Sequence, residues 1–205
     1  RFTKVFVDAL TDSDLRSIVS SRFDSFSKDF VNQIIDFNND IQNEVVHLGE
    51  YGAEGGPWEF NLRDVFRWCE LIDAGHSSHA AGARDLYYQR FRNQEDRERV
   101  DRTFQKHFGM SMIGKALPSF EIAGDVVRIG ETRLNRLSRS NRVLQKDISD
   151  QTSELVFTRL MQMEAVARCV NLRWPCLLVG GSGSGKTTIV SSLASLCNAT
   201  LVEHC

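Results

Sequence analysis

The sequence predicts a mixed fold in which a bundle of α-helices is followed by a β-hairpin and then by the start of a parallel α/β domain. Three observations predict it. Apolar residues recur at three- and four-residue steps through much of the first half of the chain. A Gly-Asp pair at 124–125 interrupts an alternating apolar pattern that begins after Pro118. Further along, a short apolar run leads into a glycine-rich loop and a last helical pattern over 185–197.

The chain is predicted to open with one strand and two helices. Residues 2–8, FTKVFVD, alternate in the manner of a strand. Thr11 with Asp14 three residues later has the pattern of a capping box, which predicts that a helix begins there. A longer helix is predicted over 30–45, and the glycine-rich stretch that ends at Pro57 is predicted to be a loop.

Further helices complete the predicted bundle. Asn61 and Asp64 can cap a third helix, whose apolar stripe is Leu62, Val65, Phe66, Cys69 and Ile72. Residues 83–109 add one or two helices, with inward residues predicted to be Leu86, Phe91, Val100, Phe104 and Phe108. The bundle with its preceding strand is assigned to residues 1–117.

Residues 118–150 are predicted to be a β-hairpin followed by a basic linker. The hairpin pattern ends in four arginines at three-residue steps, namely Arg133, Arg136, Arg139 and Arg142. We interpret this basic stripe as the solvated face of a linker, with contact to an acidic protein or RNA surface as the alternative. The net charge of −2 gives no electrostatic reason to expect direct binding of nucleic acid.

The third predicted region, residues 151–205, begins with an amphipathic helix. Its apolar residues step by four and three positions and are Val156, Leu160, Met163, Ala167 and Val170. Residues 176–179 then form a short apolar run after Pro175, as expected of a buried parallel strand. A second strand is predicted over 200–205.

The loop between that strand and the last helix has the pattern G-x-x-x-x-G-K-[ST] of a phosphate-binding loop. Its residues are Gly180, Gly181, Ser182, Gly183, Ser184, Gly185, Lys186 and Thr187, followed by Thr188. In such a loop, backbone N–H groups and the helix N-terminus bind phosphate oxygens. Lys186 is predicted to reach the β- and γ-phosphates of ATP, and the Thr187 hydroxyl to bind Mg²⁺. A flexible Gly/Ser turn is the alternative, and the strand and helix on either side argue against it.

Composition limits the class of protein to which the chain can belong. With 205 residues, of which 41% are hydrophobic, the chain is long enough to bury a core. No apolar run approaches the roughly 20 residues of a membrane span, and residues 1–10 lack the layout of a signal peptide. The sequence is therefore expected to be soluble and intracellular, without a membrane partner.

ATP hydrolysis needs an acidic residue, at the end of a later strand, that holds the magnesium ion. Only 205 − 187 = 18 residues follow Thr187, and Glu203 among them is interpreted as a polar residue at a strand end. We therefore expect the chain to be a piece of a larger protein, cut within its second nucleotide-binding domain. The isolated piece is expected to bind nucleotide weakly and to have no ATPase activity.

Three stretches resemble the midasin family of giant, dynein-related AAA+ ATPases of ribosome assembly. They are RFTKVFVDALTDSDL, GGPWEFNLRDVFRWCELI and LVFTRLMQMEAVARCVNLRWPCLLVGGSGSGKTT. The resemblance implies that residues 1–117 are the last strand and helical lid of one AAA+ module. It implies that residues 118–150 are a linker, and that residues 151–205 begin the next module.

The same resemblance implies partners, location and site residues. Neighbouring modules of one chain would form a pseudo-hexameric ring that uses ATP and Mg²⁺ to remodel nuclear precursors of the large ribosomal subunit, removing assembly factors. Arg63, in NLRD, matches the sensor-2 arginine that reaches the γ-phosphate of its own module's nucleotide. Arg1 matches the position of an arginine finger for a neighbouring module. The alternatives are a MoxR-like or dynein-like module with another substrate, and a structural module that only holds nucleotide.

Overall fold

The fold is taken from a computed structural model, which describes residues 3–6, 10–114, 118–137 and 159–202. The chain divides into two compact units, residues 1–113 and 114–205, and each is treated by itself. None of the described helices is long and apolar enough to cross a lipid bilayer.

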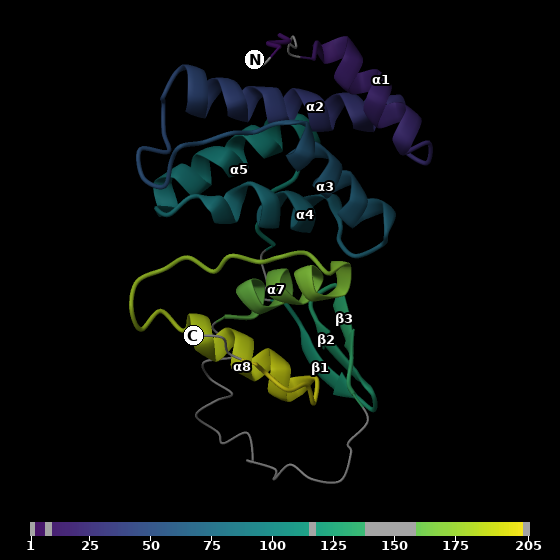
Figure 1. The fold of residues 1–205 in the computed structure, drawn as a ribbon, viewed down its shortest axis with the longest axis vertical. Coiled ribbons are helices and arrows are strands. Elements are labelled where there is room, and N and C mark those ends of the chain that lie inside the picture. Colours follow the sequence, from purple (N-terminus) through teal and green to yellow (C-terminus); the bar gives the residue numbers. More distant parts are fainter. Residues whose placement is uncertain (1–2, 7–9, 115–117, 138–158, 203–205) are drawn as a thin grey trace. The chain divides into compact units, whose positions relative to one another are not determined.

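The first unit is a bundle of helices (Figure 1). Its elements are α1 (Asp12–Arg22), α2 (Lys28–Gln42), the π-helical turn η1 (Asn43–His47), α3 (Leu62–Asp73), α4 (His79–Leu86), the 3₁₀ turn η2 (Tyr88–Arg90) and α5 (Gln94–Phe108). The loop predicted before α3 is irregular through residue 60. The helical bundle predicted from apolar periodicity is therefore confirmed.

Polar side chains fix where these helices begin. The capping box of α1 forms as predicted, because Thr11 Oγ1 accepts from the Asp14 backbone and Asp14 accepts from the Thr11 backbone. Asn61 and Asp64 make the same reciprocal pair at the start of α3. Each pair satisfies backbone N–H groups that have no partner inside the helix, so the start of the helix is set by local sequence.

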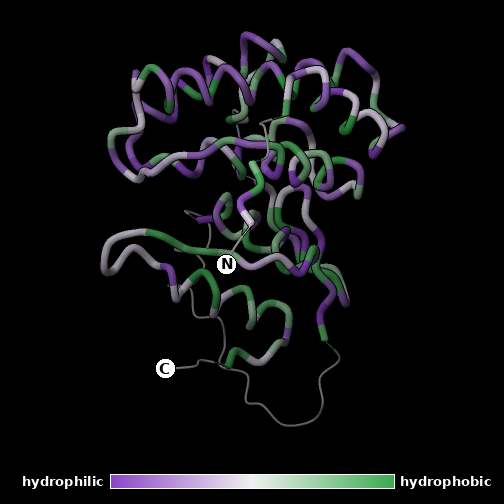
Figure 2. Tube along the Cα trace, turned by 45° about the horizontal axis from the view of Figure 1, so that its top comes forward, coloured by the Kyte–Doolittle hydropathy of each residue, from purple (hydrophilic) through white to green (hydrophobic). Residues whose placement is uncertain are grey.

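Aromatic side chains from several helices fill the core of this unit. Phe37 lies 5.6 Å from Trp68, 5.0 Å from Tyr87 and 5.6 Å from Phe104, measured between ring centroids in edge-on contacts. All four side chains have 0% exposure. Figure 2 shows hydrophobic and hydrophilic residues alternating along the helices, as amphipathic helices packed on one core require. Such edge-on pairs stabilise the bundle beyond the area they bury.

Asp40 on α2 contacts α5, which lies at the end of the sequence of this unit. Its Oδ2 lies 2.8 Å from Lys106 Nζ and 2.8 Å from His107 Nε2, both on α5. Burial alone would raise the pKa of Asp40, but the hydrogen bonds from Lys106 and His107 outweigh it and hold that pKa below its ordinary value. The contact between α2 and α5 thus includes a charged pair at its edge.

The second unit contains a three-stranded antiparallel meander and two helices. The elements are β1 (Phe120–Ala123), β2 (Val126–Ile129), β3 (Thr132–Asn135), α7 (Leu160–Leu172) and α8 (Lys186–Leu196). The predicted hairpin with a turn at 124–125 is confirmed, since Ala123 pairs with Val126. A second two-residue turn at 130–131 adds β3, which the sequence analysis did not separate.

The inner face of the meander packs against α7 and α8. Val127, Ile129 and Leu134 share one buried cluster with residues of both helices, among them Met163 and Ile189. At the edge of this core, Glu164 and Arg168 form an ion pair, and these residues are only 2% and 1% exposed. The backbone N–H of Glu131 donates to Glu164 Oε1 at 2.8 Å. The buried carboxylate therefore joins the turn between β2 and β3 to α7.

The predicted fold class was a helical bundle, a β-hairpin and the start of a parallel α/β domain, and its mixed α and β character with a helical bundle is confirmed. The sheet among the described residues is antiparallel, however, and three predicted strands do not form there. Residues 3–6, 176–179 and 200–202 have no strand structure. Leu177 is 87% exposed and Val179 is 68% exposed, so the run before the loop is not buried. A strand needs a neighbouring strand to accept its backbone hydrogen bonds, and no described segment pairs with these residues.

The predicted arginine stripe is also corrected. Arg136 is partly buried rather than fully solvated: its Nε donates to Leu196 O at 2.9 Å and its Nη1 to Gly124 O at 3.3 Å. A cation at the end of α8 is favourable because the last carbonyls of a helix carry partial negative charge. Arg133 lies exposed on β3, while Arg139 and Arg142 lie outside the described residues.

Candidate functional site

The glycine-rich loop ends at the first residue of α8, as predicted. Ser184 N donates to Gly181 O at 3.3 Å, which closes a turn inside the loop. Gly183 and Gly185 have φ of 75° and 86°, a left-handed conformation that side chains with a Cβ rarely adopt. Gly185 O accepts the first helical hydrogen bond, from Ile189 N at 2.9 Å. Glycine at these two positions lets the loop turn directly into the helix.

Lys186 folds back over the loop. Its Nζ donates to Gly180 O and to Gly181 O, each at 2.7 Å, and lies 3.3 Å from Ser184 Oγ. Among the described residues, the ammonium is thus held by neutral oxygens. An anion bound there would give the ammonium a charged acceptor, and charge-assisted hydrogen bonds are stronger than neutral ones.

The start of α8 is open toward a ligand. It has no side-chain cap and no acidic residue in its first turn. Thr187 and Thr188 are both exposed. The first backbone N–H groups of an α-helix have no partner inside it, and they carry partial positive charge. A phosphate at this end of α8 would meet backbone donors, the Lys186 ammonium and two hydroxyl groups.

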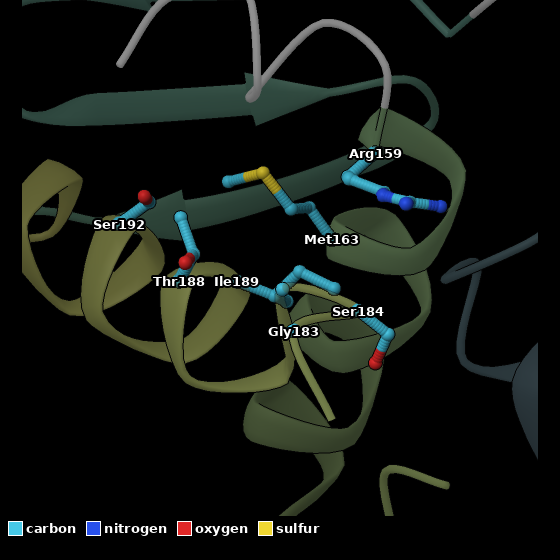
Figure 3. A pocket seen from close by; sticks show the side chains of 8 residues that line it. Arg159, Met163, Gly183, Ser184, Thr188, Ile189 and Ser192 are labelled. Atoms are coloured by element: carbon cyan, nitrogen blue, oxygen red, sulfur yellow. The ribbon is translucent and has the colours of Figure 1, made fainter. Parts of the chain in front are cut away.

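A small pocket of about 60 Å³ lies next to the loop, between α7 and α8. Figure 3 shows that Arg159, which directly precedes α7, and Met163 on α7 contribute to its lining, while α8 contributes Thr188, Ile189 and Ser192. Small-molecule sites usually have about 300–1,000 Å³. The pocket by itself cannot enclose a nucleotide.

The glycine-rich loop was predicted from the sequence, but not all of the pocket. Arg159 and Ser192 were not predicted as lining residues, and Met163 was predicted only as an apolar residue of an amphipathic helix. Met163 is 1% exposed and does pack in the core, yet it also lines the pocket. Ser192 follows Thr188 by one helical turn, so helical spacing gave a signal for it. Arg159 directly precedes a separate helix, α7, and no local pattern points to it.

Arg63 lies in the first turn of α3, in the helical unit. Its backbone N–H donates to Asn61 Oδ1 at 2.9 Å, while its side chain is exposed. Among the described residues, its guanidinium makes no hydrogen bond or ion pair. Arg63 and Lys186 belong to different units. Arg1 lies outside the described residues.

The helical bundle is an AAA+ lid. The midasin AAA lid domain family matches residues 14–111, which span α1 to α5. Two curated relatives are similar over nearly the whole chain. Midasin of Dictyostelium discoideum is 31% identical over 223 aligned residues, covering 99% of this chain. Midasin of Giardia intestinalis is 29% identical over 224 aligned residues, also covering 99% of this chain. The chain belongs to the midasin family of AAA+ ATPases.

The chain spans only 4% and 5% of the lengths of these two relatives. The similarity extends through both units, because 99% of the chain is aligned in each comparison. The activity, substrates and partners of the whole protein are therefore proposals.

Proposed function

We propose that residues 180–188 bind the phosphates of ATP, together with Mg²⁺, within a midasin-type AAA+ ATPase. The observation that carries the proposal is the position of Lys186, whose ammonium lies over Gly180 O and Gly181 O at the start of an uncapped helix. A phosphate replaces these two carbonyls as the acceptor of the lysine. The exposed helix N-terminus supplies further donors.

In this proposal each residue of the loop has a role. Backbone N–H groups of Gly181, Ser182, Gly183, Ser184 and Gly185 surround the phosphate oxygens. Lys186 binds the β- and γ-phosphates, the Thr187 hydroxyl binds Mg²⁺, and Thr188 adds a donor. The described donor set fits the metal, because Mg²⁺ prefers oxygen ligands and commonly combines one or two protein oxygens with phosphate oxygens. Bound Mg²⁺ neutralises the charge on the phosphates.

Arg63 is proposed to serve a different nucleotide, the one bound by the module to which the lid belongs. Its exposed guanidinium, which has no partner in the described unit, supports this role. A guanidinium binds phosphate oxygens in a two-pronged geometry and draws the lid toward them. Arg1 is proposed as an arginine finger for a neighbouring module, on the family resemblance alone.

For the whole protein, we propose a ring of six AAA+ modules in one chain. ATP hydrolysis in this ring drives the release of assembly factors from precursors of the large ribosomal subunit in the nucleus. The family membership supports this activity. A division into the end of one module (1–117), a linker (118–150) and the start of the next (151–205) is part of the proposal.

The proposal is tested by ATP hydrolysis in the full-length protein. We expect Lys186→Ala to weaken ATP binding at its module by about 10- to 100-fold, since one charge-assisted interaction is lost. Lys28→Ala is the matched control, because Lys28 is exposed at the start of another helix, α2, in the other unit. Unchanged binding and hydrolysis in Lys186→Ala would reject the phosphate-binding role. Nucleotide retained without turnover would favour a structural module.

A further inference from the structure

Arg90 contacts both the segment that precedes Arg63 and the helix that carries it. Arg90 ends η2, and its Nη2 donates to Glu59 O at 2.9 Å. Its Nη1 lies 3.4 Å from Asp64 Oδ2. Its Cζ lies 4.5 Å from the centroid of the Phe60 ring, which is the geometry of a cation–π contact. One guanidinium therefore bridges a loop carbonyl, a loop aromatic ring and the first turn of α3.

The group that Arg90 contacts on α3 is also the group that caps this helix. Asp64 Oδ2 accepts from Asn61 N at 3.2 Å, and Asn61 Oδ1 accepts from Arg63 N at 2.9 Å. The side chain of Asp64 is 14% exposed and that of Arg90 is 31% exposed, so solvent screens the pair only in part. The backbone of Arg63 is thus held by a cap that Arg90 supports from outside α3.

We propose that Arg90 is a positioning residue that fixes the first turn of α3 and thereby directs Arg63 toward the γ-phosphate. This rests on the proposed role of Arg63. The side chain of Arg63 is long and has no partner in the described unit. Where its guanidinium can reach therefore depends on the position of the backbone that carries it. A displacement of about 1 Å in a group that acts on the reacting phosphate can cost about 100-fold in rate.

The first test measures amide hydrogen exchange in the 205-residue chain. In Arg90→Gln, exchange over residues 59–65 is expected to rise about tenfold, the effect of losing one hydrogen bond. The matched control is Arg97→Gln, because Arg97 Nε also donates to a backbone carbonyl, Phe91 O at 2.8 Å, and its Cζ lies 5.7 Å from the Tyr88 ring centroid. Unchanged exchange over 59–65 in Arg90→Gln would overturn the inference.

The second test measures ATP turnover by the full-length protein. Arg90→Gln is expected to lower kcat by a factor approaching that of Arg63→Ala, with little change in KM. The double variant should be no slower than Arg63→Ala alone, because Arg90 acts through Arg63. Arg97→Gln should retain the original kcat. Arg90→Lys should restore part of the rate, since it keeps the charge over Phe60. If Arg90→Gln does not fold, the rate of Arg90→Lys tests the positioning role of Arg90 instead.

The outcomes separate the two proposals. If Arg63→Ala has no effect on turnover, the proposed role of Arg63 is wrong, whatever Arg90 does to exchange. If Arg63→Ala lowers turnover but Arg90→Gln does not, or if the two losses multiply, Arg63 keeps its role and the positioning role of Arg90 is rejected.

Discussion

Replacing Gly130 by alanine tests how the meander is fixed to α7. Gly130 has φ of 58° in the turn between β2 and β3. A Cβ at this position would overlap Glu164 Oε1 and would lie 2.6 Å from Glu164 Cδ. The carboxylate would have to move away, and it would then lose the hydrogen bond from Glu131 N and weaken its pair with Arg168.

Gly124 is a closely matched control. It occupies the first position of the preceding two-residue turn with φ of 56°, and a Cβ there would have no atom within 4 Å. Gly124→Ala therefore isolates the cost of a left-handed alanine, about 1–2 kcal/mol. Gly130→Ala adds the displacement of a buried carboxylate. A hydrogen bond to a charged group contributes about 1.5–3 kcal/mol, so we expect an excess of about 2 kcal/mol.

The assay is amide hydrogen exchange of α7, which reports on the second unit alone. An excess of about 2 kcal/mol corresponds to α7 exchanging about 30-fold faster in Gly130→Ala than in Gly124→Ala. Exchange in α2 should be the same in both variants, because α2 belongs to the other unit. Equal exchange of α7 in the two variants would refute the role assigned to Glu164.

Three further predictions concern the helical unit and the exposed loop. Phe104→Ala should destabilise that unit by about 3–5 kcal/mol in urea unfolding, because Phe104 is 0% exposed; a cost below about 1 kcal/mol would show that the core repacks. Burial raises the pKa of Cys69 to about 12. Iodoacetamide should therefore label exposed Cys176 in the folded chain and label Cys69 only after unfolding. Labelling of Cys69 in the folded chain would contradict this prediction. Asp40→Asn should cost no more than about 1 kcal/mol at neutral pH. Folding lowers the pKa of Asp40, so the stability that its charged form contributes is lost as the carboxylate becomes protonated. The difference in unfolding free energy between the original chain and Asp40→Asn should therefore vanish as the pH falls below about 4. A difference that stays constant with pH would contradict this prediction.

Local signals in the sequence were enough to predict the helical bundle and the starts of α1 and α3, but not the start of α4 at His79. Thr11 with Asp14, and Asn61 with Asp64, form their capping pairs within three residues of sequence, so no distant contact is needed. The glycine-rich loop was predicted for the same reason. Its two left-handed positions are glycines, and Lys186 follows directly as the first residue of α8.

Features that depend on distant partners were predicted less well. The apolar run at 176–179 resembles a strand, but a strand also needs a neighbouring segment, and none pairs with it among the described residues. Glu164 and Arg168 are spaced like an ordinary surface pair at i and i+4, yet both are buried. Their burial depends on the turn at 130–131, whose backbone donates to Glu164. Nothing in the local pattern of α7 indicates that contact.

The central claim, that residues 180–188 bind nucleotide phosphates, is tested most directly by titrating Mg²⁺-ATP into the isotopically labelled chain and following its amide resonances. The account predicts shifts at Gly183, Gly185 and Lys186 that saturate at millimolar nucleotide. Lys28→Ala should retain these shifts and Lys186→Ala should lose them. If the folded chain shows no shift in the loop at millimolar Mg²⁺-ATP, or if Lys186→Ala shifts as the original chain does, the phosphate-binding assignment is contradicted.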